Sequence, residues 1–262
     1  ALRPKALLVR PLCLSANPQS DSLDRKLVLA QVFIESIKCK PKERNDDFIY
    51  GVMENVTNPL SGKVSNIILR QADVKFWTTC LNELMGKNIE DDQIRVCVVG
   101  SPGIGKTTTT PFAIRELLWT HNKTVVYRIR DPEKPTCLMF TPRKDGHVDT
   151  ESISYDNIES IDAVYSEDTY FFVDPDITKN NCEPSKAFRF RVIIVASPDE
   201  RHWEGNMFSK VTPSGNGGYF RFYPPWTLNE LLSGFQDLPR AKDKDLPITE
   251  EKVRELYHVF GG

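Results

Sequence analysis

The segment from Val96 to Leu118, VCVVGSPGIGKTTTTPFAIRELL, constrains the fold more than any other part of the chain. An apolar run leads into a glycine-rich turn and then into a helix-like stretch, and residues 100–107 fit the phosphate-binding pattern G-x-x-x-x-G-K-[ST], the P-loop. Glycine permits backbone angles and close approaches that a Cβ atom would prevent. Consecutive N–H groups can then turn inward around a phosphate, at which the next helix points its positive N-terminus.

Each residue of this motif has an expected role in binding a nucleoside triphosphate, ATP or GTP. Lys106 would reach the β- and γ-phosphates as a point charge, and the hydroxyl of Thr107 would ligate the Mg²⁺ that bridges them. The residues expected to bind the nucleotide are Gly100, Ser101, Pro102, Gly103, Ile104, Gly105, Lys106, Thr107 and Thr108.

A second informative segment is the apolar run Thr169 to Val173, which Asp174 follows. Such a strand is typical of a Walker B motif, whose carboxylate holds the water shell of the magnesium ion beside Thr107. Pro175 stands where hydrolytic P-loop proteins usually carry a glutamate, so Asp176 is either a water-orienting base or a turn residue. The sequence therefore indicates slow or absent hydrolysis.

A third candidate position is Ser197, which follows the apolar run 190–196. In additional-strand P-loop proteins, the strand next to the P-loop strand ends in a small polar residue that senses the γ-phosphate. Arg70 and Trp77 are candidates for contact with the base, with core packing as the simpler role for Trp77. The expected catalytic residues are Lys106, Asp174, Asp176 and Ser197, and the expected metal ligands are Thr107 and Asp174.

Hydrophobic periodicity places the remaining elements. We expect helices at 22–37, 72–85 and 248–260. A further helix is expected after the capping box formed by Thr227 and Glu230. Strands are expected at 64–69, 94–99, 124–129, 136–140, 169–173, 190–196 and 219–223. The strands 124–129 and 136–140 are expected to form a hairpin or the edge of a meander. Pro111 predicts either a bend in the helix after the motif or a second helix capped by Thr110.

Composition narrows the classes of partner. The net charge is −2, so the chain lacks a global basic surface for nucleic acid, and DNA contact would need a local patch. No apolar run approaches the roughly 20 residues of a membrane span. The six cysteines are scattered without a C-x-x-C pair, which favours free thiols in a reducing compartment over zinc binding.

Five segments together resemble the NTPase region shared by Crinkler effectors and retrotransposon hotspot proteins: GSPGIGKT, YFFVDPD, RVIIVASPDERHW, FYPPWTLNELL and EEKVRELYHVFGG. The resemblance covers about residues 65–262. It implies an α/β, parallel-sheet P-loop NTPase of the additional-strand class, AAA-related or STAND-like, with Lys106 and Thr107 as the Walker A pair and Asp174 as the Walker B acid. It also implies a nuclease-like or kinase-like C-terminal domain beyond this chain, and a secreted effector that acts in a host nucleus.

These observations together predict three parts: a mainly helical N-terminal arm (1–64), a P-loop NTPase core (65–247), and the start of a C-terminal lid helix that the chain does not complete (248–262). The expected function is nucleotide binding with slow Mg²⁺-dependent hydrolysis, as the NTPase module of a larger effector. The alternative is a nucleotide-dependent interaction switch without hydrolysis. A nucleotide kinase is disfavoured because the chain has no arginine-rich lid, and self-association stays open.

Overall fold

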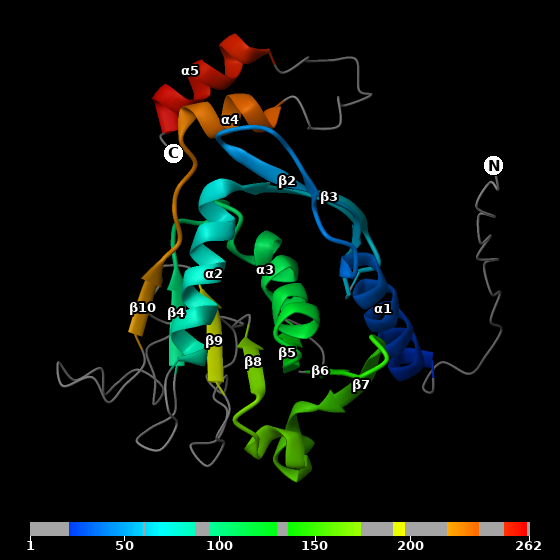
Figure 1. The fold of residues 1–262 in the computed structure, drawn as a ribbon. Helices are drawn as coiled ribbons and strands as arrows, with labels where there is room; N and C mark the ends of the chain where they lie inside the picture. Colours follow the sequence, from blue (N-terminus) through cyan, green and yellow to red (C-terminus); the bar gives the residue numbers. More distant parts are fainter. Residues whose placement is uncertain are drawn as a thin grey trace.

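A central sheet with helices against one face organises the chain (Figure 1). In the computed structural model, the residues described are 21–59, 61–86, 95–129, 136–173, 191–196, 219–235 and 249–260. The expected α/β class is confirmed, because the sheet is mixed and mostly parallel. Among these described residues, no helix is both long enough and apolar enough to cross a lipid bilayer.

The seven strands of this sheet lie in the order β10-β4-β9-β8-β5-β6-β7. Neighbouring strands from β10 to β5 are parallel, whereas β6 and β7 are antiparallel additions, which confirms the expected 124–140 hairpin. Strands β4, β8 and β9 are buried along their whole length, which explains their uninterrupted apolar sequences. The strand bounds are β4 Arg95–Val99, β5 Thr124–Ile129, β6 Thr136–Pro142, β7 Val148–Ser154, β8 Thr169–Val173, β9 Arg191–Ala196 and β10 Tyr219–Phe222.

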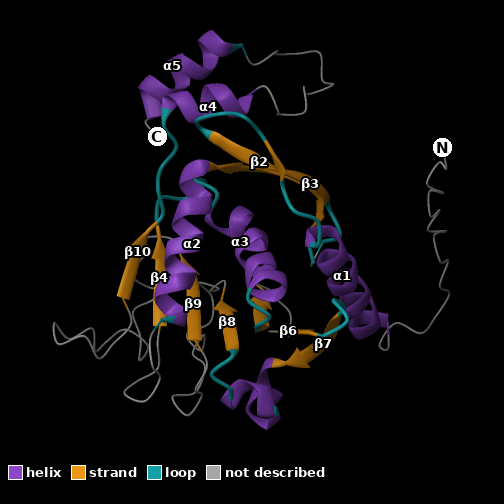
Figure 2. Cartoon of the chain, in the orientation of Figure 1, coloured by secondary structure: helices purple, strands orange, loops and turns teal. Residues whose placement is uncertain are grey.

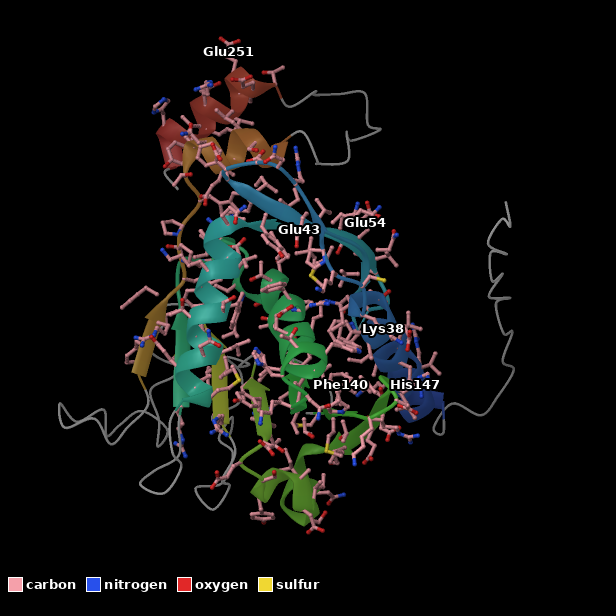
Figure 3. All side chains as sticks on the ribbon, in the orientation of Figure 1. Lys38, Glu43, Glu54, Phe140, His147 and Glu251 are labelled. Atoms are coloured by element: carbon pink, nitrogen blue, oxygen red, sulfur yellow. The ribbon has the colours of Figure 1, made fainter. Side chains whose placement is uncertain are left out.

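Three helices cover one face of the sheet: α1 (Asp21–Ile37), α2 (Gln71–Met85) and α3 (Lys106–Arg115). Side chains fill the layer between them and the sheet, with Phe140 inside it and charged residues such as Lys38 and Glu54 outside (Figure 3). A second buried cluster on the opposite face includes Ile158 of the 3₁₀ helix η2 (Tyr155–Ser160), which η3 (Asp162–Tyr165) follows. The expected helices 22–37 and 72–85 are confirmed within one residue.

Helix α3 runs through Pro111 as one helix, so the alternative of a second helix capped by Thr110 is wrong. Pro111 has no N–H to donate to the carbonyl of Thr107. The Thr110 hydroxyl instead donates to the carbonyl of Lys106 at 3.2 Å. The irregularity follows later, as the π-helical turn η1 (Glu116–Thr120).

The arm before α2 is less helical than predicted. After α1, a three-stranded antiparallel sheet forms from β1 (Lys42–Glu43), β2 (Ile49–Thr57) and β3 (Val64–Arg70). Strand β2 escaped prediction because its pairing with β3 shifts register between Met53 and Val56, where Asn55 adopts a positive φ of 55°. This bulge breaks the two-residue alternation by which strands are recognised.

Two further helices, α4 (Leu228–Phe235) and α5 (Glu250–Phe260), lie together beyond the small sheet, as the purple elements at the top of Figure 2 show. The predicted capping box begins α4: the Glu230 N–H donates to Thr227 Oγ1 at 3.3 Å, and the Thr227 N–H donates to Glu230 Oε2 at 2.7 Å. Thr249 caps α5 by accepting from the Lys252 N–H at 3.2 Å. The predicted capping box of α4 is therefore confirmed.

Candidate functional site

The segment 100–105, hereafter the glycine loop, joins the carboxyl end of β4 to the start of α3. Val99, the last residue of β4, is in register with Ala196, the last residue of β9. On the far side of β9, Val173 ends β8 in register with Ile194. The glycine loop therefore lies at the edge where the parallel strands end, which is where open α/β sheets bind ligands.

Two glycines give the loop its shape. Gly103 has φ 82° and Gly105 has φ 97°, both in the left-handed region that side chains other than glycine adopt with strain. No described atom lies within 4 Å of where a Cβ atom would stand at either position, so the backbone is open to a ligand there. Gly100 is glycine for another reason: a Cβ atom would come within 2.7 Å of Ile104 Cδ1 and 3.3 Å of Tyr223 Cβ.

The N-terminus of α3 is suited to an anion. Gly105 is its N-cap, none of the described side chains caps it, and its first turn contains no acidic residue. The first N–H groups of a helix have no partner within the helix, and the helix dipole makes this end positive. A cradle of this kind, with flexible glycines before it, fits a phosphate group.

Lys106 supplies a cation at the same place. The residue is 8% exposed, and its Nζ donates to the carbonyl oxygens of Gly100 at 2.5 Å and Ser101 at 2.9 Å. The ammonium group is thus held against the loop that precedes it. Thr107 and Thr108, the next two residues, are exposed at the first turn of α3.

The other predicted site residues, Asp174, Asp176 and Ser197, lie outside the described residues. The strands that lead to two of them, β8 and β9, end at the same edge as β4. Within the described ranges, no group of three or more His, Cys, Asp or Glu side chains could hold a metal ion.

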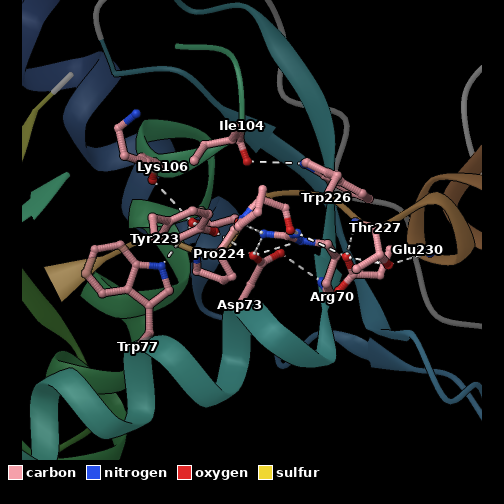
Figure 4. A network of polar contacts seen from close by, with 12 residues as sticks. Arg70, Asp73, Trp77, Ile104, Lys106, Tyr223, Pro224, Trp226, Thr227 and Glu230 are labelled. Carbon is pink, nitrogen blue, oxygen red and sulfur yellow. Dashed lines mark hydrogen bonds and ion pairs between the residues drawn. The ribbon is translucent and has the colours of Figure 1, made fainter. Parts of the chain in front are cut away.

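A buried cluster of polar groups beside the glycine loop was not anticipated from the sequence (Figure 4). Arg70, at the end of β3, is 0% exposed, and each of its five N–H groups has an acceptor. Nε donates to Asp73 Oδ1 at 3.0 Å, while Nη2 donates to Asp73 Oδ1 at 2.5 Å and to Pro224 O at 2.8 Å. Nη1 donates to Pro225 O at 2.8 Å and to Glu230 Oε2 at 3.3 Å.

This geometry overturns the expectation that Arg70 contacts a base, because a fully buried guanidinium with all its donors engaged has none to offer a ligand. Burial alone would lower the pKa of Arg70, but hydrogen bonds and charge attraction from Asp73, with the charge of Glu230, outweigh it and raise the pKa. Arg70 stays charged and joins β3 and α2 to the segment before α4.

A directed chain of hydrogen bonds extends this cluster to α3. The Trp77 indole donates to Thr109 Oγ1 at 2.9 Å, Thr109 Oγ1 lies 2.7 Å from the Tyr223 hydroxyl, and that hydroxyl donates to Asp73 Oδ1 at 2.7 Å. The carboxylate of Asp73 can only accept, so the single hydrogen of the Tyr223 hydroxyl goes to Asp73. The single hydrogen of the Thr109 hydroxyl then has two acceptors within reach, the Tyr223 oxygen at 2.7 Å and the carbonyl of Lys106 at 3.2 Å. Burial, with the charge of Asp73, raises the pKa of Tyr223 well above its usual value.

Trp77 itself is 0% exposed, so core packing is confirmed as its role over contact with a base. One further contact reaches the glycine loop: the Trp226 indole donates to the carbonyl of Ile104 at 3.2 Å, and the Arg70 guanidinium stacks 4.5 Å from the Trp226 ring. We call the set Arg70, Asp73, Trp77, Thr109, Tyr223, Trp226 and Glu230 the Arg70 network.

The buried thiols offer no nucleophile. Cys80, Cys97 and Cys137 are buried, and their thiols are free, as the scattered cysteines predicted. Burial raises the pKa of each thiol to about 12, so all three are protonated near neutral pH. Among the described residues at this edge, the groups that could contact a ligand are backbone N–H groups, the hydroxyls of Thr107 and Thr108, and Lys106.

Comparison of the sequence with models of known protein families found no match, and comparison with curated proteins found no significant one.

Proposed function

We propose that the chain is a P-loop NTPase module that binds ATP or GTP through residues 100–108. The observation that carries the proposal is the glycine loop: two left-handed glycines lead directly into an uncapped helix N-terminus, and Lys106 is held beside them. Three features that each favour phosphate thus come from one stretch of nine residues.

The strand order supports the additional-strand class. In this sheet β9 lies between β4, which leads into the glycine loop, and β8, which leads to Asp174. This arrangement would bring Ser197, directly after β9, between the phosphates and Asp174. Ser197 is accordingly proposed as the sensor of the γ-phosphate.

The residues fit a magnesium nucleotide. Lys106 would hold the β- and γ-phosphates, the hydroxyl of the exposed Thr107 would be a direct ligand for the metal, and Asp174 would hold its water shell. Mg²⁺ bound by these residues would supply positive charge that neutralises the phosphates. The chain's own contribution would be to orient the phosphates with backbone N–H groups and to hold Lys106 beside them.

Hydrolysis is proposed to be slow, because Pro175 stands where a catalytic glutamate is expected and Asp176 is the nearest replacement. A switch that binds without hydrolysing is the second candidate, favoured by the same Pro175. On the resemblance to Crinkler effectors, we propose that the module serves a larger effector with a nuclease-like or kinase-like domain that acts in a nucleus.

The test of this proposal is a titration with fluorescent ATP and GTP in the presence of Mg²⁺. Lys106→Ala is expected to weaken binding at least about tenfold, because a hydrogen-bonded charge contributes roughly 1.5–3 kcal/mol. The matched control is Lys75→Ala, which removes an exposed lysine of α2 and should bind like wild type. Equal affinity of all three proteins would remove residues 100–108 from the site.

Phosphate release separates the two candidates. Steady-state phosphate release is measured for the same proteins and for Asp174→Ala. Release by wild type that falls in both Lys106→Ala and Asp174→Ala supports an NTPase. Nucleotide binding without release by wild type supports the switch, and release unchanged by both substitutions contradicts the proposed chemistry.

A further inference from the structure

Trp226, a member of the Arg70 network, makes a side-chain hydrogen bond to the backbone of the glycine loop. Its indole N–H donates to the carbonyl of Ile104 at 3.2 Å, between the two left-handed glycines. The orientation of the Ile104–Gly105 peptide depends on ψ of Ile104 and on φ of Gly105, and glycine restricts its φ less than any other residue. An external hydrogen bond at this point therefore helps to fix the orientation of that peptide.

The direction of the bond matters for an anion. The described peptide bonds are all trans, so the C=O of Ile104 and the N–H of Gly105 point in opposite directions across one planar unit. When Trp226 holds the carbonyl on its own side, the N–H of Gly105 is turned to the other side of the loop. The N–H of Gly105 can therefore bind a phosphate only on that other side of the loop.

Trp226 is itself held rigidly. The guanidinium of Arg70 stacks 4.5 Å from its ring, and that guanidinium is fixed by Asp73, Glu230 and two proline carbonyls. The neighbouring residue Thr227 begins the capping box of α4. The indole therefore stands at the end of a buried, fully bonded framework, which suits it to pre-organise a loop.

We propose that Trp226 is a positioning residue for phosphate binding, acting through the Ile104–Gly105 peptide. The inference rests on the proposed nucleotide site and deepens it. Its ligand class is the polyphosphate chain shared by ATP, GTP and inorganic tripolyphosphate, because the contact orients a backbone donor and leaves the base untouched.

Trp226→Phe tests the inference, because phenylalanine keeps an aromatic ring for Arg70 and removes the N–H donor together with the second ring of the indole. The dissociation constants for ATP and for inorganic tripolyphosphate, with Mg²⁺, should both rise about fivefold, the factor given by one neutral hydrogen bond. The melting temperature should change by less than about 3 °C, because Trp226 is half-buried and phenylalanine keeps one aromatic ring at this position.

The matched control is Trp77→Phe, which removes an indole donor from the core of the same network, where it bonds to Thr109. This control should lower the melting temperature and leave both dissociation constants within about twofold of wild type. If Trp226→Phe melts more than about 5 °C below wild type, Trp226→Tyr is used as the test variant, because tyrosine fills more of the same space. The same rise in both dissociation constants is expected for Trp226→Tyr.

Several outcomes would overturn the inference. Wild-type affinity in Trp226→Phe would make Trp226 a packing residue, and a loss for ATP but not for tripolyphosphate would make it a base contact. An equal loss in Trp77→Phe would assign the effect to general destabilisation. Failure of the nucleotide site itself gives a different result, in which wild type and Lys106→Ala bind neither ligand.

Discussion

Replacement of Arg70 by methionine tests whether the Arg70 network holds the core together. The substitution keeps an unbranched side chain of similar length and removes the charge and all five donors. It leaves the carboxylates of Asp73, 1% exposed, and Glu230, 7% exposed, in the interior without the cation that now neutralises both. The carbonyls of Pro224 and Pro225 lose a donor as well.

Breaking a buried ion pair on one side costs about 3–5 kcal/mol, because the remaining charge stays desolvated. For a protein of this size, each kilocalorie lowers the melting temperature by roughly 2–4 °C, so the expected fall is about 6–20 °C. The control is Arg221→Met, which breaks a pair with Glu83 whose side chains are 39% and 36% exposed. Such a pair contributes at most about 1 kcal/mol.

Calorimetric or fluorescence melting of wild type and both variants at pH 7.5 completes the test. Arg70→Met should melt well below Arg221→Met, because only the first substitution leaves carboxylates in the interior without their cation. Equal melting of the two arginine variants would refute the reasoning.

Two further predictions concern single groups. Cys39, which is exposed, should react with a thiol reagent at pH 8 in the folded protein, whereas Cys97, whose pKa burial raises to about 12, should react only after unfolding. Mapping of labelled peptides by mass spectrometry checks this, and equal rates would contradict it. The pKa of Asp46 is lowered to about 2 by hydrogen bonds, first from Ser233 and then from two backbone N–H groups. Ser233→Ala should raise the pKa of Asp46 toward 3.8 in an NMR titration. A lowered carboxyl pKa stabilises the fold above pH 3.8, and this stabilisation is lost as the pH falls toward 2, so the variant should lose less stability on acidification than wild type. An unchanged pKa would refute the assignment.

Local features of this fold were predictable from the sequence. The cap at Thr227 was predicted because a capping box depends on two residues three positions apart. The strand β4, the glycine loop and the start of α3 were predicted because the motif itself specifies strand, turn and helix. The pairing of β5 with β6 followed from two apolar runs close in sequence.

Contacts between distant segments were not predictable. Arg70 meets Pro225 and Glu230 across 155 and 160 residues, and no local pattern distinguishes an arginine that ends in such a site from one that faces solvent. The segment FYPPWTLNELL was noticed for its resemblance and its capping box, but its contact with Ile104 depends on how β10 pairs with β4. The bulge at Asn55 likewise concealed β2.

The most direct measurement is a crystal structure of the chain with Mg²⁺ and a non-hydrolysable ATP analogue. The account predicts the β-phosphate against the backbone N–H groups of residues 103–107, Trp226 still bonded to the carbonyl of Ile104, and Lys106 Nζ moved from the carbonyls of Gly100 and Ser101 to the phosphates. A nucleotide bound away from residues 100–108, or Lys106 unmoved on those carbonyls with the analogue bound, would contradict it.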